Sequence, residues 1–228
     1  MPGAARTDDL QADVPSATAH LYRNGVVMGK VVFDISMSLD GFVTASDRSP
    51  QEPMGEGGQR LHDWAFGDVR NQTYLAEIVA GVGAVIAGRE TYDTSVPWWG
   101  PDGPTGAARR PVFVVTHEAP ADPPDGVYTF VTDGIHSALQ QARTVAGDMD
   151  VEVMGGASIG RQYLAAGLVD EILIHLVPVL FGNGTPLFQS LDIGHVPLEP
   201  PEVTESPTAT HLRYHVATRQ PGRGQVSP

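Results

Sequence analysis

The chain has 228 residues, of which 41% are hydrophobic and 18% are charged. This balance is typical of a globular protein and argues against a disordered or membrane-embedded chain. The formal net charge of −13 disfavours binding to nucleic acid or to anionic membranes, because both require a basic face. Cysteine is absent, which excludes disulfides and cysteine metal sites, and Lys30 is the only lysine, which disfavours Schiff-base chemistry. We therefore expect a soluble, cytoplasmic protein that binds neither nucleic acid nor membranes.

Residues 1–29 differ from the rest of the chain. They mix Pro, Gly, Ala, Asp and Thr without a sustained hydrophobic period, and an apolar strand begins at Lys30. This pattern predicts an N-terminal extension over 1–29, with an arm docked on the domain as the alternative. A single domain is predicted over 30–219, followed by a tail at 220–228.

From residue 30 onward, short apolar runs alternate with segments of helical spacing. In chain order we expect a strand at 30–37, a loop at 48–58, a helix at 71–79, a strand at 84–87, a loop at 97–111, strands at 112–115 and 127–131, a helix at 135–145, a strand at 151–154, a helix at 158–166, a strand at 170–178, and hairpin strands at 202–205 and 210–217. Apolar strands separated by helices indicate an α/β fold with a mixed, mostly parallel sheet, helices on both faces and a C-terminal antiparallel hairpin. The two loops are long enough to act as lids.

The segment that follows the predicted strand 151–154 is the most informative one. Met154 leads into Gly155 and Gly156, and Ser158 and Ile159 open a helix. Adjacent glycines let the backbone approach an anion, and free amides at a helix start favour a phosphate. An ordinary tight turn between a strand and a helix is the alternative.

Two further predicted strands end in groups that suit an anion. Gly88, Arg89 and Thr91 follow the strand at 84–87, and Thr116 and His117 follow the strand at 112–115. Taken singly, Thr91 could be a helix cap and Arg89 a solvated charge. Ligands of α/β sheets bind beyond the carboxyl ends of the strands, so three such ends together favour a dinucleotide across the sheet edge.

The exit of the first strand carries a further candidate site. Ser38 and Asp40 can hydrogen-bond a carboxamide or a substrate, and Gly41 can take a positive φ. The alternative is an Asp-Gly turn in which Ser38 is a local cap.

Together these segments resemble the dihydrofolate reductase-like superfamily, and most closely the reductase domain of the bifunctional riboflavin-biosynthesis deaminase-reductase, the RibD C-terminal domain family. The resemblance covers about 30–217. It rests on the motifs above and on two stretches at 167–172 and 178–184, which read Gly-Leu-Val-Asp-Glu-Ile and Pro-Val-Leu-Phe-Gly-Asn-Gly. It implies an NADP-dependent oxidoreductase that uses NADPH to reduce a small conjugated heterocycle, pterin- or pyrimidine-like, as in folate or riboflavin metabolism.

The resemblance also implies roles for individual residues. Met154, Gly155, Gly156, Ser158 and Ile159 would hold the cofactor pyrophosphate, and Gly88, Arg89 and Thr91 would grip phosphates. Thr116 and His117 would lie near the adenosine 2′-phosphate, and Ser38, Leu39 and Asp40 would line the nicotinamide and substrate pocket.

The chain also departs from these families. Without cysteine, it has no counterpart of the zinc deaminase half. The acid that holds the pterin in dihydrofolate reductases has its nearest candidate in Asp63, for which a solvated helix charge is the alternative. Asp40 and Asp63 are thus the predicted catalytic residues, and the substrate is left open. Phe42, Trp64, Trp98 and Trp99 are candidates for the pocket wall.

Other classes of function remain as alternatives. A nucleotide-binding sensor or regulator without turnover would carry the same cofactor residues. A metal site at His211 and His215 is disfavoured because Arg213 lies between them on the same strand face. The remaining histidines, including His175 inside an apolar strand, are predicted to be satisfied core or surface residues. The long strand at 170–178 and the hairpin need covering, which predicts a homodimer.

Overall fold

The computed structural model describes residues 22–23, 26–67, 69–123, 125–189, 191 and 193–217. The predicted tail at 220–228 and most of the predicted extension at 1–29 lie outside these residues. Within the extension, β1 (Tyr22–Arg23) and β2 (Val26–Val27) pair in antiparallel fashion. Among the described residues, no helix combines the length and the apolarity needed to cross a bilayer.

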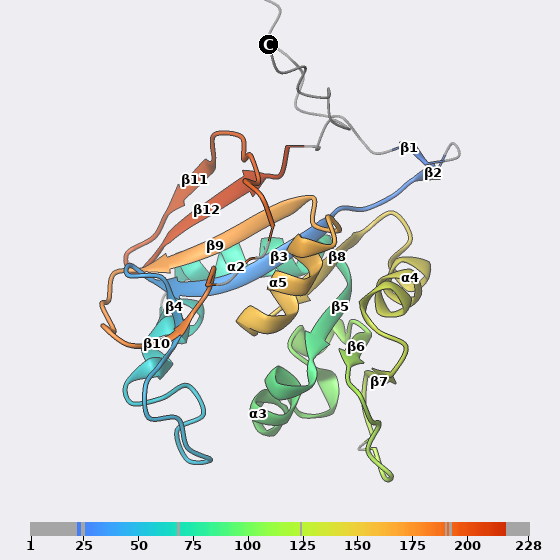
Figure 1. The fold of residues 1–228 in the computed structure, drawn as a ribbon, viewed down its shortest axis with the longest axis horizontal. Coiled ribbons are helices and arrows are strands. Elements are labelled where there is room, and N and C mark those ends of the chain that lie inside the picture. The colour runs from blue at the N-terminus through green and yellow to red at the C-terminus, as the bar shows by residue number, and fades with distance from the viewer. Residues whose placement is uncertain are drawn as a thin grey trace, which may run out of the picture.

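The described residues contain one eight-stranded sheet, in the order β11-β12-β9-β3-β8-β5-β6-β7 (Figure 1). In chain order its strands are β3 (Val31–Ser38), β5 (Val82–Gly88), β6 (Val112–Val115), β7 (Tyr128–Val131), β8 (Asp150–Met154), β9 (Glu171–Val177), β11 (Glu202–Glu205) and β12 (Thr210–His215). The strands from β9 to β7 are parallel, whereas β12 pairs antiparallel with β9, and β11 with β12. The predicted mixed, mostly parallel sheet with a C-terminal antiparallel hairpin is confirmed.

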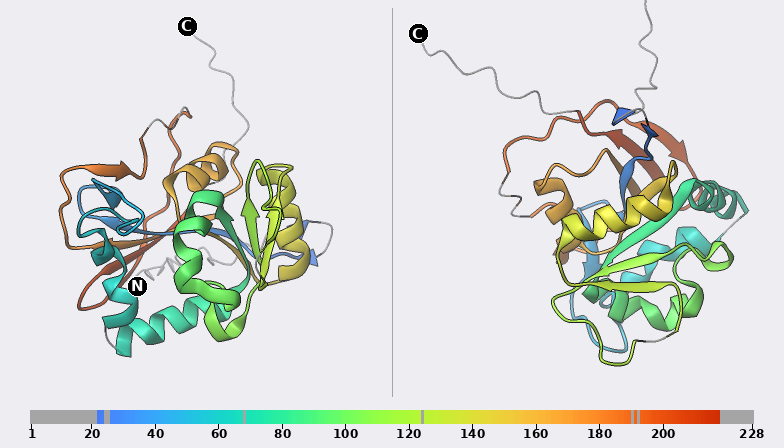
Figure 2. Two further views of the ribbon diagram at one scale, coloured as in Figure 1. Left: turned by 90° about the horizontal axis from the view of Figure 1, so that it is seen from below. Right: turned by 90° about the vertical axis from the view of Figure 1, so that its right-hand side faces the viewer.

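Helices cover both faces of the sheet. Their bounds are α1 (Asp63–Gly67), α2 (Val69–Gly81), α3 (Arg89–Trp99), α4 (Ile135–Ala146) and α5 (Ala157–Ala165). Alternate residues of β3, such as Val31 and Phe33, pack into a core with α4 and α5, while α1, α2 and α3 pack on the opposite face. In the left panel of Figure 2, α5 lies above the sheet and α2 below it.

Gly160 sets how closely α5 approaches the sheet. A Cβ atom at this position would lie 2.0 Å from the Cζ atom of Phe33, whose ring is fully buried in the core. Contacts between carbon atoms are normally about 3.5–4.0 Å. Only glycine therefore lets α5 rest directly on the Phe33 ring, and this contact fixes the height of the helix start above the sheet.

Two parts of the fold differ from the sequence-based prediction. The helix after β5 continues through Pro97 to Trp99, and the predicted loop at 97–111 holds two 3-10 turns, η2 (Gly100–Asp102) and η3 (Gly106–Ala108). Pro97 removes one helical hydrogen bond, but the helix ends only two residues later, where Gly100 takes a φ of 58°.

A small second sheet was not predicted either. The strand β4 (Phe42–Ala45) pairs with β10 (Gly184–Pro186), about 140 residues later in the chain, and a 3-10 turn, η1 (Gly58–His62), precedes α1. Such short strands form through long-range pairing and leave a weak local signal.

The homodimer was predicted because the strand at 170–178 and the hairpin need covering, and the observed sheet already covers that strand. The apolar strand β9 lies between β3 and β12, so it is already covered. The edge strand β11 is exposed along its length and carries Glu202 and Glu205, charges that discourage pairing with another chain. The homodimer stays a prediction, which sedimentation at two protein concentrations would test.

A buried carboxylate, Glu171, binds several side chains at the start of β9. Glu171 is 1% exposed and accepts hydrogen bonds from Lys30 and from Arg213, with His215 Nδ1 at 3.0 Å. Burial is the largest single influence and raises the pKa of Glu171, but the hydrogen bonds from Lys30 and Arg213 outweigh it and lower that pKa below its usual value.

Candidate functional site

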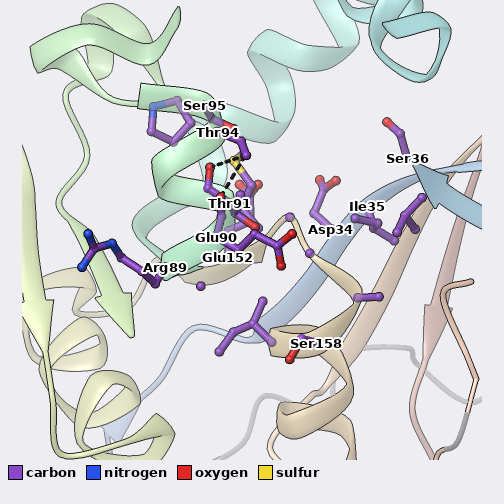
Figure 3. A pocket seen from close by; sticks show the side chains of 18 of the residues that line it. Asp34, Ile35, Ser36, Arg89, Glu90, Thr91, Thr94, Ser95, Glu152 and Ser158 are labelled. Carbon is purple, nitrogen blue, oxygen red and sulfur yellow. Dashed lines mark hydrogen bonds between the residues drawn. The ribbon is translucent and has the colours of Figure 1, made fainter. Parts of the chain in front are cut away.

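A cleft of about 880 Å³ opens at the carboxyl ends of β8, β5 and β6, which are neighbours in the sheet. This volume lies in the range of small-molecule sites, about 300–1,000 Å³. Ten of the predicted cofactor residues line the cleft: Gly88, Arg89, Thr91, Thr116, His117, Met154, Gly155, Gly156, Ser158 and Ile159. Figure 3 shows Thr91 on α3, Ser158 on α5 and Asp34 on β3 around one common space.

The glycine turn after β8 packs directly against the start of α3. Gly155 and Gly156 have φ angles of 71° and 48°, a region that favours glycine. A Cβ atom on Gly155 would lie 2.4 Å from the Cγ2 atom of Thr91, and one on Gly156 would lie 2.8 Å from its Oγ1 atom. Two of the predicted anion-binding segments therefore form one packed unit at the cleft.

Hydrogen bonds also connect the start of α3 with the loop that follows β6. Arg89 donates from Nε to the carboxylate of Asp93 at 2.8 Å and 2.9 Å, and from Nη1 to the carbonyl of Glu118 at 3.1 Å. The hydroxyl of Thr116 donates to the same carbonyl at 2.9 Å. In Figure 3, Arg89 extends sideways from α3, away from the centre of the cleft. Arg89, Thr116 and Glu118 thus form one end of the cleft.

The residues that follow β3 form a hydrogen-bonded turn, and Ser38 and Asp40 do not line the cleft. Ser38 is fully buried; its hydroxyl donates to Asp40 at 2.6 Å and accepts from the Phe42 amide at 2.9 Å. Asp40 also accepts from the amides of Phe181 and Gly182, the latter at 2.7 Å. The hydrogen bond from Ser38, followed by these amides, lowers the pKa of Asp40. This is the local turn that the sequence left as the alternative, and it clamps two distant loops together.

Other predicted residues also lie outside the cleft. Leu39 is 60% exposed, and Asp63 is exposed at the start of α1. Neither lines the cleft, and nor do Ser38 and Asp40. Their backbone explains this, because the chain turns after Ser38 toward the Val179 carbonyl, to which the Leu39 amide donates at 2.9 Å. Of the predicted aromatic wall, Trp64 and Trp99 line the cleft, whereas Phe42 and Trp98 do not.

Sequence reasoning missed the polar row at the cleft floor. Four neighbouring strands each contribute one side chain to the face that packs against α1 and α2: Glu152 from β8, Asp34 from β3, His175 from β9 and His211 from β12. The first three line the cleft, while His211 lies 1% exposed behind His175. We call this set the floor row.

Hydrogen bonds connect three members of the floor row. His175 Nε2 lies 2.9 Å from Asp34 Oδ1, and His175 Nδ1 lies 2.7 Å from His211 Nδ1. Trp64 covers both imidazoles, with ring centroids 4.1 Å from His175 and 4.9 Å from His211, and its indole N–H donates to Ser36 at 2.9 Å. A tryptophan from α1 thus separates the row from solvent on that side.

The two ends of the floor row have displaced pKa values. Glu152 is 3% exposed, and burial, together with the nearby negative charge of Asp34, raises the pKa of its carboxyl well above the usual range. Burial and the neighbouring His175 lower the pKa of His211 to about 4. At neutral pH we therefore expect a neutral His211, and burial favours the protonated form of Glu152.

The comparison with protein families places the whole fold. The family model described as the RibD C-terminal domain matches residues 29–212. The chain belongs to the RibD C-terminal domain family. The match begins next to Lys30, where the sequence predicted the domain to start, and it includes every element of the cleft.

Individual relatives agree with membership in the RibD C-terminal domain family. The uncharacterised protein YwjB of Bacillus subtilis is 29% identical over 165 residues, which cover 71% of this chain and 84% of YwjB. A structure of a candidate riboflavin biosynthesis protein from a Shewanella species superposes with a TM-score of 0.60 at 22% identity, covering 83% of this chain and 99% of that one. Dihydrofolate reductase from Enterococcus faecalis, solved with NADP(H), gives a TM-score of 0.55 at 12% identity over 84% and 98% of the two chains. The fold is therefore dihydrofolate reductase-like.

Proposed function

We propose that this chain is an NADPH-dependent reductase that transfers a hydride to a small conjugated heterocycle of pterin or pyrimidine type. One observation carries the proposal: three neighbouring strand ends, β8, β5 and β6, line a single cleft with the residues expected to hold a dinucleotide. Membership of a reductase family and the dihydrofolate reductase-like fold support the same activity.

The donors along the cleft suit the parts of a dinucleotide. The start of α5 has no side-chain cap, so its backbone amides and the Ser158 hydroxyl are available to a pyrophosphate. Arg89 and His117, next to Thr116, would hold the adenosine phosphate at the other end. When bound, the reduced nicotinamide supplies the hydride, and the protein supplies orientation and excludes water.

Discrimination between NADPH and NADH depends on opposing charges at the adenosine end. Arg89 favours a 2′-phosphate, whereas Glu118, which also lines this end, disfavours one. The Arg89 guanidinium is half-exposed and pairs with Asp93 through Nε and with the Glu118 carbonyl through Nη1, so a ligand phosphate would contact its remaining N–H groups. We therefore expect a preference for NADPH.

The opposite half of the cleft suits an unphosphorylated ring. Its wall is apolar, with Trp64, Leu75 and Ile78, and its floor holds Asp34 and Glu152. Arg48 also lines the cleft, but its guanidinium is bound to Glu90 and to a backbone carbonyl of its own loop. A ring with N–H donors can pair with the Asp34 carboxylate, while a phosphate group would meet two carboxyl groups. We propose Asp34 and Glu152, in place of Asp40 and Asp63, as the residues that contact the substrate.

Two measurements on the full chain test this function. Titration of the tryptophan fluorescence, to which Trp64 and Trp99 in the cleft contribute, should show saturable NADPH binding that is tighter than NADH binding. Single-turnover oxidation of bound NADPH is then followed with a dihydropterin, an aminopyrimidine and a phosphoribosyl-aminopyrimidine as acceptors, and the unphosphorylated rings should react faster.

Matched variants test whether Asp34 or Asp63 contacts the substrate. Asp34→Asn removes a charged acceptor for the ring N–H and should slow single-turnover oxidation roughly 10- to 100-fold without preventing NADPH binding, whereas Asp63→Asn should leave the rate unchanged. The reverse pattern would restore the assignment made from sequence. NADPH binding without oxidation by any acceptor would instead favour the nucleotide sensor.

A further inference from the structure

The floor row constrains where its protons lie. An ionised Asp34 can only accept, so the ring nitrogen of His175 that faces it at 2.9 Å must donate. A neutral imidazole has one donor and one acceptor, so Nδ1 of His175 must then accept. The Nδ1 atom of His211, 2.7 Å away, is consequently the donor of that contact.

The surroundings of His211 agree with a hydrogen bond donated from His211 to His175. With its proton on Nδ1, His211 has only a lone pair on Nε2, and Nε2 is a buried atom without a hydrogen-bond partner in the described part of the chain. A protonated Asp34 or a doubly protonated His175 would instead make His175 Nδ1 the donor to His211, and either would leave a buried N–H donor unpaired at that Nε2 atom. Orphaned buried N–H groups are rarer than orphaned acceptors, which favours the first direction.

We propose that His175 and His211 are positioning residues that hold Asp34 as an oriented anion, so that Glu152 carries the single proton of the carboxyl pair and donates it to the substrate. This inference rests on the proposed reductase function. It assigns different roles to the two floor carboxyls: Asp34 accepts a ring N–H and Glu152 is the general acid. Two carboxyls whose surroundings push their protonation apart are a recurring arrangement for acid–base work.

Three other titratable groups lie near the floor row. They are His62 from η1, Tyr74 from α2 and Arg213 from β12. Tyr74 stacks on His211 with ring centroids 4.3 Å apart, and Trp64 covers the other side. Both aromatic contacts desolvate His211, which disfavours its charged form.

The substrate receives its hydride and its proton from two different groups. With the hydride that the C4–H bond of the reduced nicotinamide would give up on its oxidation, the ring carbon of a substrate C=N bond gains a C–H bond, while the O–H bond of Glu152 breaks and its proton forms an N–H bond at the adjacent ring nitrogen. The product gains one C–H and one N–H bond, and Glu152 is left as a carboxylate beside the Asp34 anion. Repulsion between these two anions favours reprotonation of Glu152 from solvent once the product has left. Asp34 and the two histidines end the cycle unchanged.

The wild-type protein tests the positioning directly and without a substrate. Nitrogen NMR of the full chain labelled with ¹⁵N-histidine at pH 7 should show two neutral imidazoles, with the proton on Nε2 of His175 and on Nδ1 of His211. An infrared band from a protonated carboxyl should be present, should disappear in Glu152→Gln, and should persist in the surface control Asp148→Asn. Reversed tautomers, a doubly protonated His175 or a missing carboxyl band would overturn the proposal.

Two substitutions of His211 separate positioning from mere packing. The amide N–H of Asn can replace the Nδ1–H donor, whereas Leu retains bulk and removes the donor. His211→Leu should let His175 sample both tautomers, change the pH profile, and lower kcat about 10-fold or more with KM and NADPH affinity within about twofold. His211→Asn should recover most of the rate. Equal losses in both variants, or a full rate with an unchanged His175 tautomer in His211→Leu, would refute the positioning role.

Failure of this inference and failure of the reductase function give different results. If Glu152→Gln oxidises bound NADPH at the wild-type rate, the general-acid role is overturned and the reductase function stands. If the tautomers are reversed while wild-type turnover is normal, the positioning role is overturned. If no acceptor oxidises bound NADPH, the reductase function and the proton transfer both fail.

Discussion

Replacing Gly160 with alanine should disturb the candidate site through the fold alone. The added Cβ atom would lie 2.0 Å from Cζ and 2.2 Å from Cε2 of Phe33, which is 0% exposed. Since carbon contacts need about 3.5 Å, either the ring or the helix must move by roughly 1.5 Å. The ring is held in a closely packed core, so much of this movement falls on α5.

The expected cost follows from overpacking. Inserting a methyl group into a well-packed core costs about 1–3 kcal/mol, and for a chain of this size each kcal/mol lowers Tm by about 2–4 °C. We therefore expect a Tm lower by roughly 2–12 °C. The start of α5, which carries Ser158, moves with the helix, so NADPH affinity should fall in Gly160→Ala although this position contributes no side chain to the cleft.

Thermal unfolding and NADPH titration of the wild type, Gly160→Ala and the variants below test this prediction. Gly81→Ala is the matched control, because a Cβ atom there meets nothing within 4 Å at the end of α2, and it should be neutral or slightly stabilising. Adding Phe33→Leu to Gly160→Ala should relieve part of the loss, giving a favourable coupling in a double-mutant cycle. Unchanged Tm and NADPH affinity in Gly160→Ala would refute the reasoning.

The remaining predictions concern single contacts. Trp64→Phe removes the indole donor to Ser36 and should cost about 1–3 kcal/mol in urea unfolding, an effect absent if the contact is unimportant. The pKa of Glu171 is lowered in the folded chain, so its charge stabilises above the ordinary glutamate pKa and that stability is lost as pH falls through the lowered value. Glu171→Gln should therefore be less stable than wild type at pH 7, with the difference shrinking in acid; a constant difference would contradict the sign. Arg89→Gln should weaken NADPH binding roughly 10- to 100-fold and NADH binding less, while Glu118→Gln should tighten NADPH binding; equal effects on both cofactors would exclude a role at the 2′-phosphate.

Much of the fold is predictable because its strands carry local signals. The segments at 112–115 and 202–205 coincide with β6 and β11, and continuous apolar runs correctly indicate a largely parallel sheet covered on both faces. Local signals fail where pairing is distant, as for β4 and β10, or where a helix tolerates a breaker such as Pro97.

The candidate site also has one part that the sequence reveals and one part that it does not. The glycine turn at Gly155 is visible in the sequence because a positive φ and a close approach both require glycine. The floor row is not visible, since Asp34, Glu152 and His175 each stand alone in an apolar strand. Only the sheet order β12-β9-β3-β8 brings them together, and no short stretch of sequence encodes that order. The one available signal was a charged residue within an otherwise apolar strand, which favours a functional or paired group.

Asp40 illustrates how one stretch of sequence can fit two different roles. The same Ser-Leu-Asp-Gly stretch fits a pocket and a turn, and the hydrogen bonds of Asp40 to Ser38 and Gly182 are those of a turn that clamps two loops. Both partners of Asp40 belong to the chain itself, so this turn can form whether or not a ligand is bound.

A structure of the full chain with bound NADPH is the most direct test of the shared cleft. We predict the pyrophosphate on the amides from Gly155 to Ser158, the adenosine phosphate beside Arg89 and Thr116, and the nicotinamide toward Asp34. A cofactor bound on another face, or one that spans the cleft without touching the glycine turn, would contradict the proposed reductase.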